Sequence, residues 1–77
     1  MFAILVTSPD RVLFEGRAST ASFPGEQGTF EVLTLHRPLV SRLVSGEVAV
    51  DGKRVTIRRG IVRIADDVVT AVVELPE

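Results

Sequence analysis

The stretch from Phe23 to Leu39 reads Phe-Pro-Gly-Glu-Gln-Gly-Thr-Phe-Glu-Val-Leu-Thr-Leu-His-Arg-Pro-Leu and contains the only histidine of the chain. Proline fixes φ and lacks a backbone N–H, so Pro24 and Gly25 are expected to break a strand that ends at Phe23. A second strand is expected to start at Gly28, with residues that alternate between the two faces of a sheet. The stretch therefore predicts two strands, followed by a rigid polar corner at His36-Arg37-Pro38.

The composition of the whole chain favours β-structure. Valine, isoleucine and threonine supply 23 of the 77 residues, and β-branched side chains disfavour helix and suit a pleated, half-buried surface. Turn signals recur at short intervals, at Ser8-Pro9-Asp10, Gly16, Pro24-Gly25, Ser45-Gly46, Asp51-Gly52, Gly60 and Asp66-Asp67. We therefore predict an all-β fold, a small ten-stranded β-sandwich or flattened barrel, with residues 1–77 forming a single domain.

Three local patterns place parts of this fold. The strand from Met1 to Thr7 is largely apolar on both faces, which is typical of a central strand. The segment Leu39 to Val44 fits either one helical turn or a short bent strand, and we interpret it as a strand. Asp51-Gly52 is the strongest hairpin signal, because a two-residue turn of the primed type needs φ > 0 at both positions.

Charge and cysteine content exclude several classes of function. Nine basic and ten acidic residues give a net charge of -1, which argues against a strongly nucleic-acid-seeking or membrane-seeking surface. The chain has no cysteine, so it can form neither disulfides nor thiolate metal sites. The apolar segment Phe2 to Val6 is too short to span a bilayer and lacks the features of a secretion signal. A soluble protein without a targeting segment is expected.

The sequence offers little for catalysis. His36 stands beside Arg37, and a lone histidine with scattered carboxylates supplies neither a catalytic triad nor a metal site. The segment Gly46 to Lys53 resembles a phosphate loop superficially, but it has five residues between its glycines and opens no helix. We therefore predict no catalytic residue, no metal site and no cofactor, and we interpret His36 as a structural or interface residue.

Five of the nine basic residues fall within 11 positions, namely Lys53, Arg54, Arg58, Arg59 and Arg63. A small β-barrel with such a strip can bind single-stranded nucleic acid through the phosphate backbone. Aromatic stacking platforms are missing, because the chain has no Trp or Tyr and its four Phe residues are explained by core packing. A solvated or protein-facing basic surface is the preferred interpretation, and nucleic-acid binding by residues 53–63 is the alternative.

The ordered pattern of the chain carries a family resemblance. Its pieces are Ser8-Pro9, Val12 to Gly16, Phe23 to Phe30, Val32-Leu33, His36-Arg37-Pro38-Leu39, Gly46, Gly60 to Ile64 and Val68 to Glu74. In this order and spacing they resemble the N-terminal β-sandwich domain of the epsilon subunit of rotary F-type ATP synthases. The chain departs from that pattern at Glu31, Thr34-Leu35 and Arg37, where the family commonly has glycine, Pro-Gly and alanine.

Longer epsilon subunits carry two C-terminal helices that the family links to nucleotide sensing and to inhibition of ATP hydrolysis. The given sequence stops at Glu77, and two interpretations stay open: a naturally short form without those helices, or a truncated part of a longer chain.

The resemblance implies a rotor component with no active site of its own. Such a domain couples the membrane ring of c subunits to the gamma subunit during ATP synthesis. It lies at the cytoplasmic face of the bacterial inner membrane and is attached there only through the complex. By position in the family, the polar loops of the ring should contact Glu26, Gln27, Gly28 and Thr29. The gamma subunit should contact Ser8, His36, Arg37 and Ser41. No contact with nucleic acid is implied.

Overall fold

The computed structural model describes residues 1–33 and 37–76, and these form nine β-strands and no helix. The strands are β1 (Phe2–Thr7), β2 (Val12–Ala18), β3 (Ala21–Gly25), β4 (Gly28–Val32), β5 (Leu39–Leu43), β6 (Gly46–Val50), β7 (Lys53–Ile57), β8 (Arg59–Ala65) and β9 (Val68–Glu74). The all-β prediction is confirmed. Within the described residues the strands number nine, where the sequence suggested ten.

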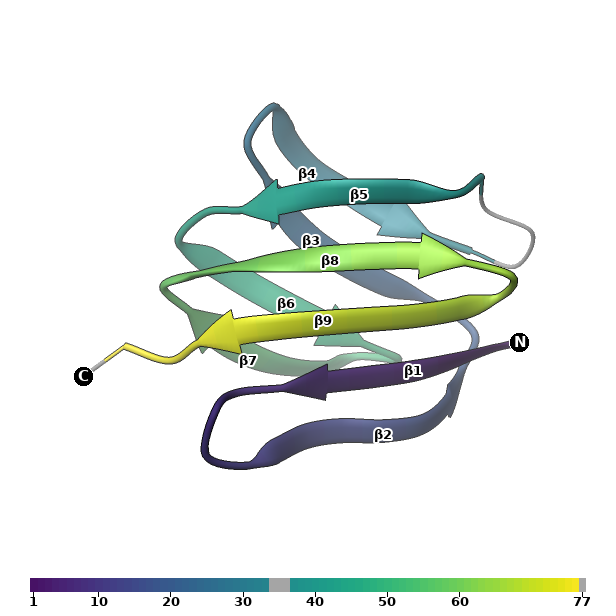
Figure 1. Ribbon diagram of the computed structural model, residues 1–77, viewed down its shortest axis with the longest axis horizontal. Coiled ribbons are helices and arrows are strands. Elements are labelled where there is room, and N and C mark those ends of the chain that lie inside the picture. Colours follow the sequence, from purple (N-terminus) through teal and green to yellow (C-terminus); the bar gives the residue numbers. More distant parts are fainter. Residues whose placement is uncertain (34–36, 77) are drawn as a thin grey trace.

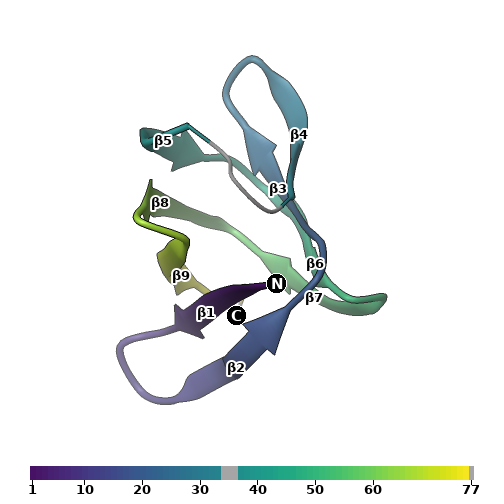
Figure 2. The ribbon, with the colours of Figure 1, turned by 90° about the vertical axis from the view of Figure 1, so that its right-hand side faces the viewer.

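The strands form one curled sheet that folds into two layers (Figure 1). The front layer has the order β2-β1-β9-β8-β5, and the back layer consists of β4, β3, β6 and β7. The layers are joined where β3 pairs with β5 through Gly25 and Leu43. Figure 2 shows the two layers side by side, with β8 and β9 in one and β3 and β6 in the other.

Strand β1 lies inside the front layer, as its two apolar faces predicted. It pairs antiparallel with β2 and parallel with β9, so the first and last strands of the chain are neighbours. Phe2, Ile4 and Val6 are buried on its inner face, while the intervening residues are half-buried on the outer face. The front layer therefore has apolar residues on both of its sides.

The core lies between the two layers. The front layer contributes Phe2, Ile4, Val6, Ala18, Leu43, Val62, Ile64, Val69, Ala71 and Val73, and the back layer contributes Ala21, Phe23, Val32, Val48, Val50 and Ile57. The ring centroids of Phe23 and Phe30 are 5.8 Å apart across the β3–β4 pair. Burial of alternate residues is what a two-layer β-fold requires, because side chains along a strand point to opposite faces.

The turns follow their local chemistry. Asp51 and Gly52 have φ values of 47° and 86°, which confirms the predicted primed turn between β6 and β7. Asp66 and Asp67 make the same kind of turn between β8 and β9, with φ values of 53° and 59°. Aspartate tolerates this region because its short side chain can hydrogen-bond locally.

One prediction about the opening stretch is wrong. Pro24 and Gly25 do not end the strand at Phe23 but belong to β3, and the turn that follows consists of Glu26 and Gln27. Proline lacks a donor but keeps its acceptor, and the Pro24 carbonyl accepts a hydrogen bond from the Val44 N–H at 2.8 Å. The restart at Gly28 is as predicted. The corner at His36 lies outside the described residues.

Candidate protein interface

The outer face of the back layer is polar. It carries Ser22, Thr29, Glu31, Glu47, Ala49, Arg54 and Thr56. Arg54 Nη1 and Glu47 Oε1 form an ion pair of 3.2 Å on this face, with both side chains largely exposed. A polar sheet face of this kind is an ordinary solvated surface.

The outer face of the front layer exposes aliphatic side chains among charged ones. We define the front apolar face as Val12, Val40, Ile61, Val68 and Val72, each with about half or more of its surface exposed. Ile61 lies opposite Val72, Val72 opposite Thr7, and Thr7 opposite Val12, so a row across β8, β9, β1 and β2 holds three exposed aliphatic side chains and the half-buried Thr7. Directly opposed side chains on one face are in contact distance. Exposed aliphatic side chains gathered on one face make that face a candidate for contact with another molecule.

A groove of about 570 Å³ adjoins this face. Arg42, Ile61 and Val72 line it, together with the backbone of Gly60. The Arg59 Nε donates to Glu74 Oε2 at 2.9 Å at the same end of the front layer. This hydrogen bond and the positive charge of Arg59 lower the pKa of Glu74 from its ordinary value.

A second groove holds the loop that the resemblance assigns to the membrane ring. Its volume is about 690 Å³, and it lies between the β3–β4 hairpin and β5. Glu26, Gln27, Gly28 and Thr29 line one side, and Ser41 lines the other. The structure therefore brings Ser41, which the resemblance assigns to the gamma contact, beside the loop assigned to the ring. All four loop residues are exposed.

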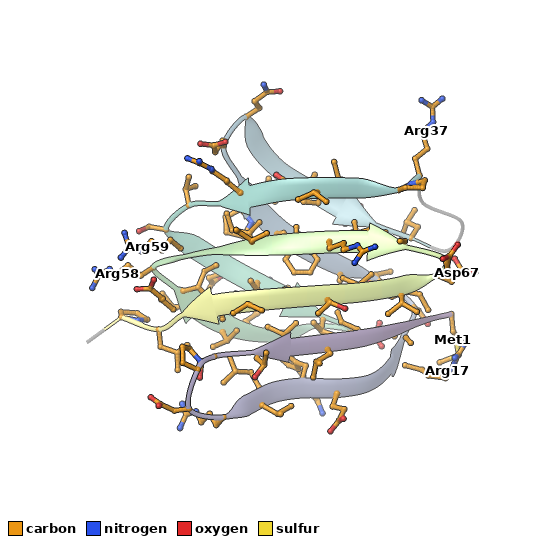
Figure 3. The ribbon with its side chains drawn as sticks, in the orientation of Figure 1. Met1, Arg17, Arg37, Arg58, Arg59 and Asp67 are labelled. Atoms are coloured by element: carbon orange, nitrogen blue, oxygen red, sulfur yellow. The ribbon has the colours of Figure 1, made fainter. Side chains whose placement is uncertain are left out.

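The other residues assigned to the gamma contact are widely spaced. Ser8 is 7% exposed in the β1–β2 turn, where its Oγ accepts hydrogen bonds from the N–H groups of Asp10 and Arg11. Arg37 is exposed just before β5, at the far side of the front layer from that turn (Figure 3). His36 lies outside the described residues. A partner that contacts both Ser8 and Arg37 must span the front layer.

The strip of basic residues predicted at 53–63 is dispersed. Lys53 and Arg54 belong to β7 in the back layer, whereas Arg63 belongs to β8 in the front layer. Arg58 and Arg59 lie together at the end of the front layer opposite Arg37 (Figure 3). The sequence cluster therefore produces no continuous basic strip.

The described residues contain no group of three histidine, cysteine or acidic side chains that could hold a metal ion. Over residues 1–33 and 37–76, no helix is long and apolar enough to cross a membrane.

Sequence reasoning missed the front apolar face. Its signal was present in Val68-Val69-Thr70-Ala71-Val72-Val73 and in the strand from Phe2 to Thr7, where both alternating sets are apolar. A strand of this kind is buried on both sides or exposes one apolar side for a partner. Nothing in a single strand distinguishes these two cases.

The fold defines the chain as a small two-layer β-sandwich, and comparisons with known proteins identify its family. Residues 1–75 match the family described as ATP synthase, Delta/Epsilon chain, beta-sandwich domain. The ATP synthase epsilon chain of a Nitratiruptor species is 35% identical over 74 residues, which are 90% of this chain and 57% of that protein. That of Endomicrobium trichonymphae is 34% identical over 77 residues, 95% of this chain and 56% of that protein. The chain belongs to the delta/epsilon family of ATP synthase β-sandwich domains.

A solved structure supports the fold. A chain in the Euglena gracilis mitochondrial ATP synthase structure (OSCP, F1 and c-ring) superposes with a TM-score of 0.83 and 22% sequence identity. The match covers 94% of this chain and 49% of that chain. The present chain thus spans about half the length of its relatives.

Proposed function

We propose that this chain is a non-catalytic central-stalk component of a proton-translocating F-type ATP synthase. It couples the membrane ring of c subunits to the gamma subunit during ATP synthesis. The family membership supports this role, and so do the names of the similar proteins, which are ATP synthase epsilon chains. In this role the chain is peripheral to the membrane and reaches it only through the complex, at the cytoplasmic face of the bacterial inner membrane.

The difference between the two outer faces is the observation that carries the proposal. The front layer exposes aliphatic side chains from β2, β9, β8 and β5, whereas the defined outer residues of the back layer are polar apart from Ala49. Covering the front apolar face removes apolar area from water, which stabilises a complex by about 25 cal/mol per Å² before association costs. We assign this face to the gamma subunit. Arg37 lies just before β5, at the border of this face, in keeping with the contact with gamma proposed for Ser8, His36, Arg37 and Ser41.

The loop Glu26, Gln27, Gly28 and Thr29 is proposed to contact the polar loops of the ring. It projects from the β3–β4 hairpin at the edge of the molecule, and its side chains are exposed and polar. A polar loop suits a contact with the ring that contains bridging water, beside the apolar contact proposed for gamma. The two contacts adjoin each other at the groove that Glu26 shares with Ile61 and Val72, so this domain would hold the two partners side by side.

Two matched variants test the proposal. Ile61→Asn together with Val72→Asn removes apolar area from the front layer, while Thr56→Asn changes an exposed β-branched residue on the back layer. We expect the front variant to weaken binding to the purified gamma subunit about tenfold or more and the back variant to leave it unchanged. Equal affinity of both variants and the parent would overturn the assignment of the face. Failure of the parent chain to bind gamma would overturn the proposed function.

A further inference from the structure

Two arginines lie among the aliphatic residues of the front layer. Strands β5 and β8 pair so that Val40 lies opposite Arg63 and Arg42 lies opposite Ile61. Arg42 and Arg63 are therefore diagonal neighbours on the outer face, and the two aliphatic side chains occupy the other diagonal. Both arginines are exposed. Diagonal neighbours of this kind have Cα atoms about 7–8 Å apart.

These two arginines differ from the paired arginines elsewhere in the sheet. Arg54 has an ion pair with Glu47, and Arg59 has one with Glu74, each between neighbouring strands. The side chains of Arg42 and Arg63 make no hydrogen bond or ion pair within residues 1–33 and 37–76. The cross-strand neighbours of Arg63 are Val40 and Thr70, which offer no charge. Glu26 shares a groove with Arg42 but forms no ion pair with it.

A partner that covers this face must compensate the positive charge of both guanidinium groups and accept their hydrogen bonds. Removing an unpaired charge from water is strongly unfavourable, and each guanidinium brings five N–H donors that need acceptors. Carboxylates meet both needs, because they pair with arginine in a bidentate geometry. Two carboxylates about one helical turn apart, with Cβ atoms about 5–6 Å from each other, are close enough for the long side chains of Arg42 and Arg63 to reach both.

We infer that the surface of the partner that covers the front apolar face carries a pair of carboxylates, which bind Arg42 and Arg63 beside the aliphatic contact. The inference rests on the proposed gamma contact and specifies its chemistry. In this arrangement the aliphatic side chains give an apolar contact without direction, and the two ion pairs fix the orientation of the partner on the face. Charge pairs of this kind select and orient a partner more than they add affinity.

Charge reversal with a matched control tests the inference. Arg42→Glu with Arg63→Glu is compared with Lys53→Glu and Arg54→Glu, which alters the net charge equally but on β7 of the back layer. We expect the front pair to weaken binding to purified gamma about a hundredfold and the back pair to change it less than about threefold. Affinity of the unaltered chain should also fall when NaCl rises from about 50 to about 500 mM, and the front variant should lose this dependence.

A chemical test identifies the acidic partners directly. In the variant Arg42→Lys with Arg63→Lys, a water-soluble carbodiimide should join the lysine amines to gamma carboxylates, and mass spectrometry should locate the Asp or Glu residues. The inference is overturned if the front charge reversal keeps the parent affinity while Ile61→Asn with Val72→Asn loses it. That outcome leaves the proposed function intact. If the unaltered chain does not bind gamma, the proposed function and the inference fail together.

Discussion

The backbone N–H of Thr20 donates to the Asp51 carboxylate at 3.0 Å, and the N–H of Asp51 donates to the Thr20 carbonyl at the same distance. The Ser19 N–H donates to the same carboxylate at 3.1 Å. Residues 31 positions apart are thus joined reciprocally, and the β6–β7 turn holds the corner where the chain passes from β2 to β3. This corner connects the front layer with the back layer.

Replacing Asp51 should therefore destabilise the fold. Asp51→Ala removes the acceptor for two backbone N–H groups and places alanine at positive φ, so we expect a loss of about 1–3 kcal/mol in the free energy of unfolding. Asp51→Asn keeps an acceptor and tolerates this φ, so its effect should be well below that of alanine. Urea denaturation of the three proteins measures the difference. Equal stability of Asp51→Ala and the parent would mean that water satisfies the corner equally well.

Gly46 should tolerate no side chain. A Cβ built there lies 2.7 Å from the Cβ of Pro24, which is buried in β3. The neighbouring strands must move to accept it, and overpacking of this kind costs about 1–3 kcal/mol. Thermal and urea unfolding of Gly46→Ala check the cost, with Glu47→Ala on the same strand as a control that should lose less than about 1 kcal/mol. A stable Gly46→Ala protein would show that β3 and β6 separate easily at this point.

The ion pair between Arg59 and Glu74 should appear as a pH effect. The pKa of Glu74 is lowered in the folded state, so its contribution to stability is present above the unfolded pKa and is lost as pH falls through the folded value. Because both side chains are exposed, the effect on stability should be small. NMR titration should find the Glu74 pKa below its ordinary value and raised by Arg59→Ala. An unchanged pKa in that variant would assign the shift to another cause.

Variants of the two proposed contact regions should lose different partners. Arg37→Glu with His36→Ala should weaken gamma binding by about 1–3 kcal/mol if these groups are desolvated in the contact. Glu26→Ala with Thr29→Ala should keep gamma binding but loosen attachment to the ring in reconstituted membranes. Loss of the same partner by both variants, or of no partner by either, would contradict the assignment.

The chain sequence determined the strands and the tight turns. Asp51-Gly52 predicts its hairpin, and Val55 and Ile57 face inward along β7 as their alternation with polar residues indicates. These features depend on φ and ψ preferences and on side-chain alternation within a few residues, so local sequence is sufficient to specify them. The apolar strand from Phe2 to Thr7 likewise indicated an interior position, and β1 lies between β2 and β9.

Only the tertiary structure decided which surfaces are left for partners. In β9, Val69 and Val73 are buried while Val68 and Val72 are exposed, although all four are the same residue type. Which set is covered depends on where the back layer lies, and that follows from contacts distant in sequence, such as the pairing of Gly25 with Leu43. The positions of Arg42 and Arg63 among the exposed aliphatic residues have the same origin, because strand register places them side by side from segments about 20 residues apart.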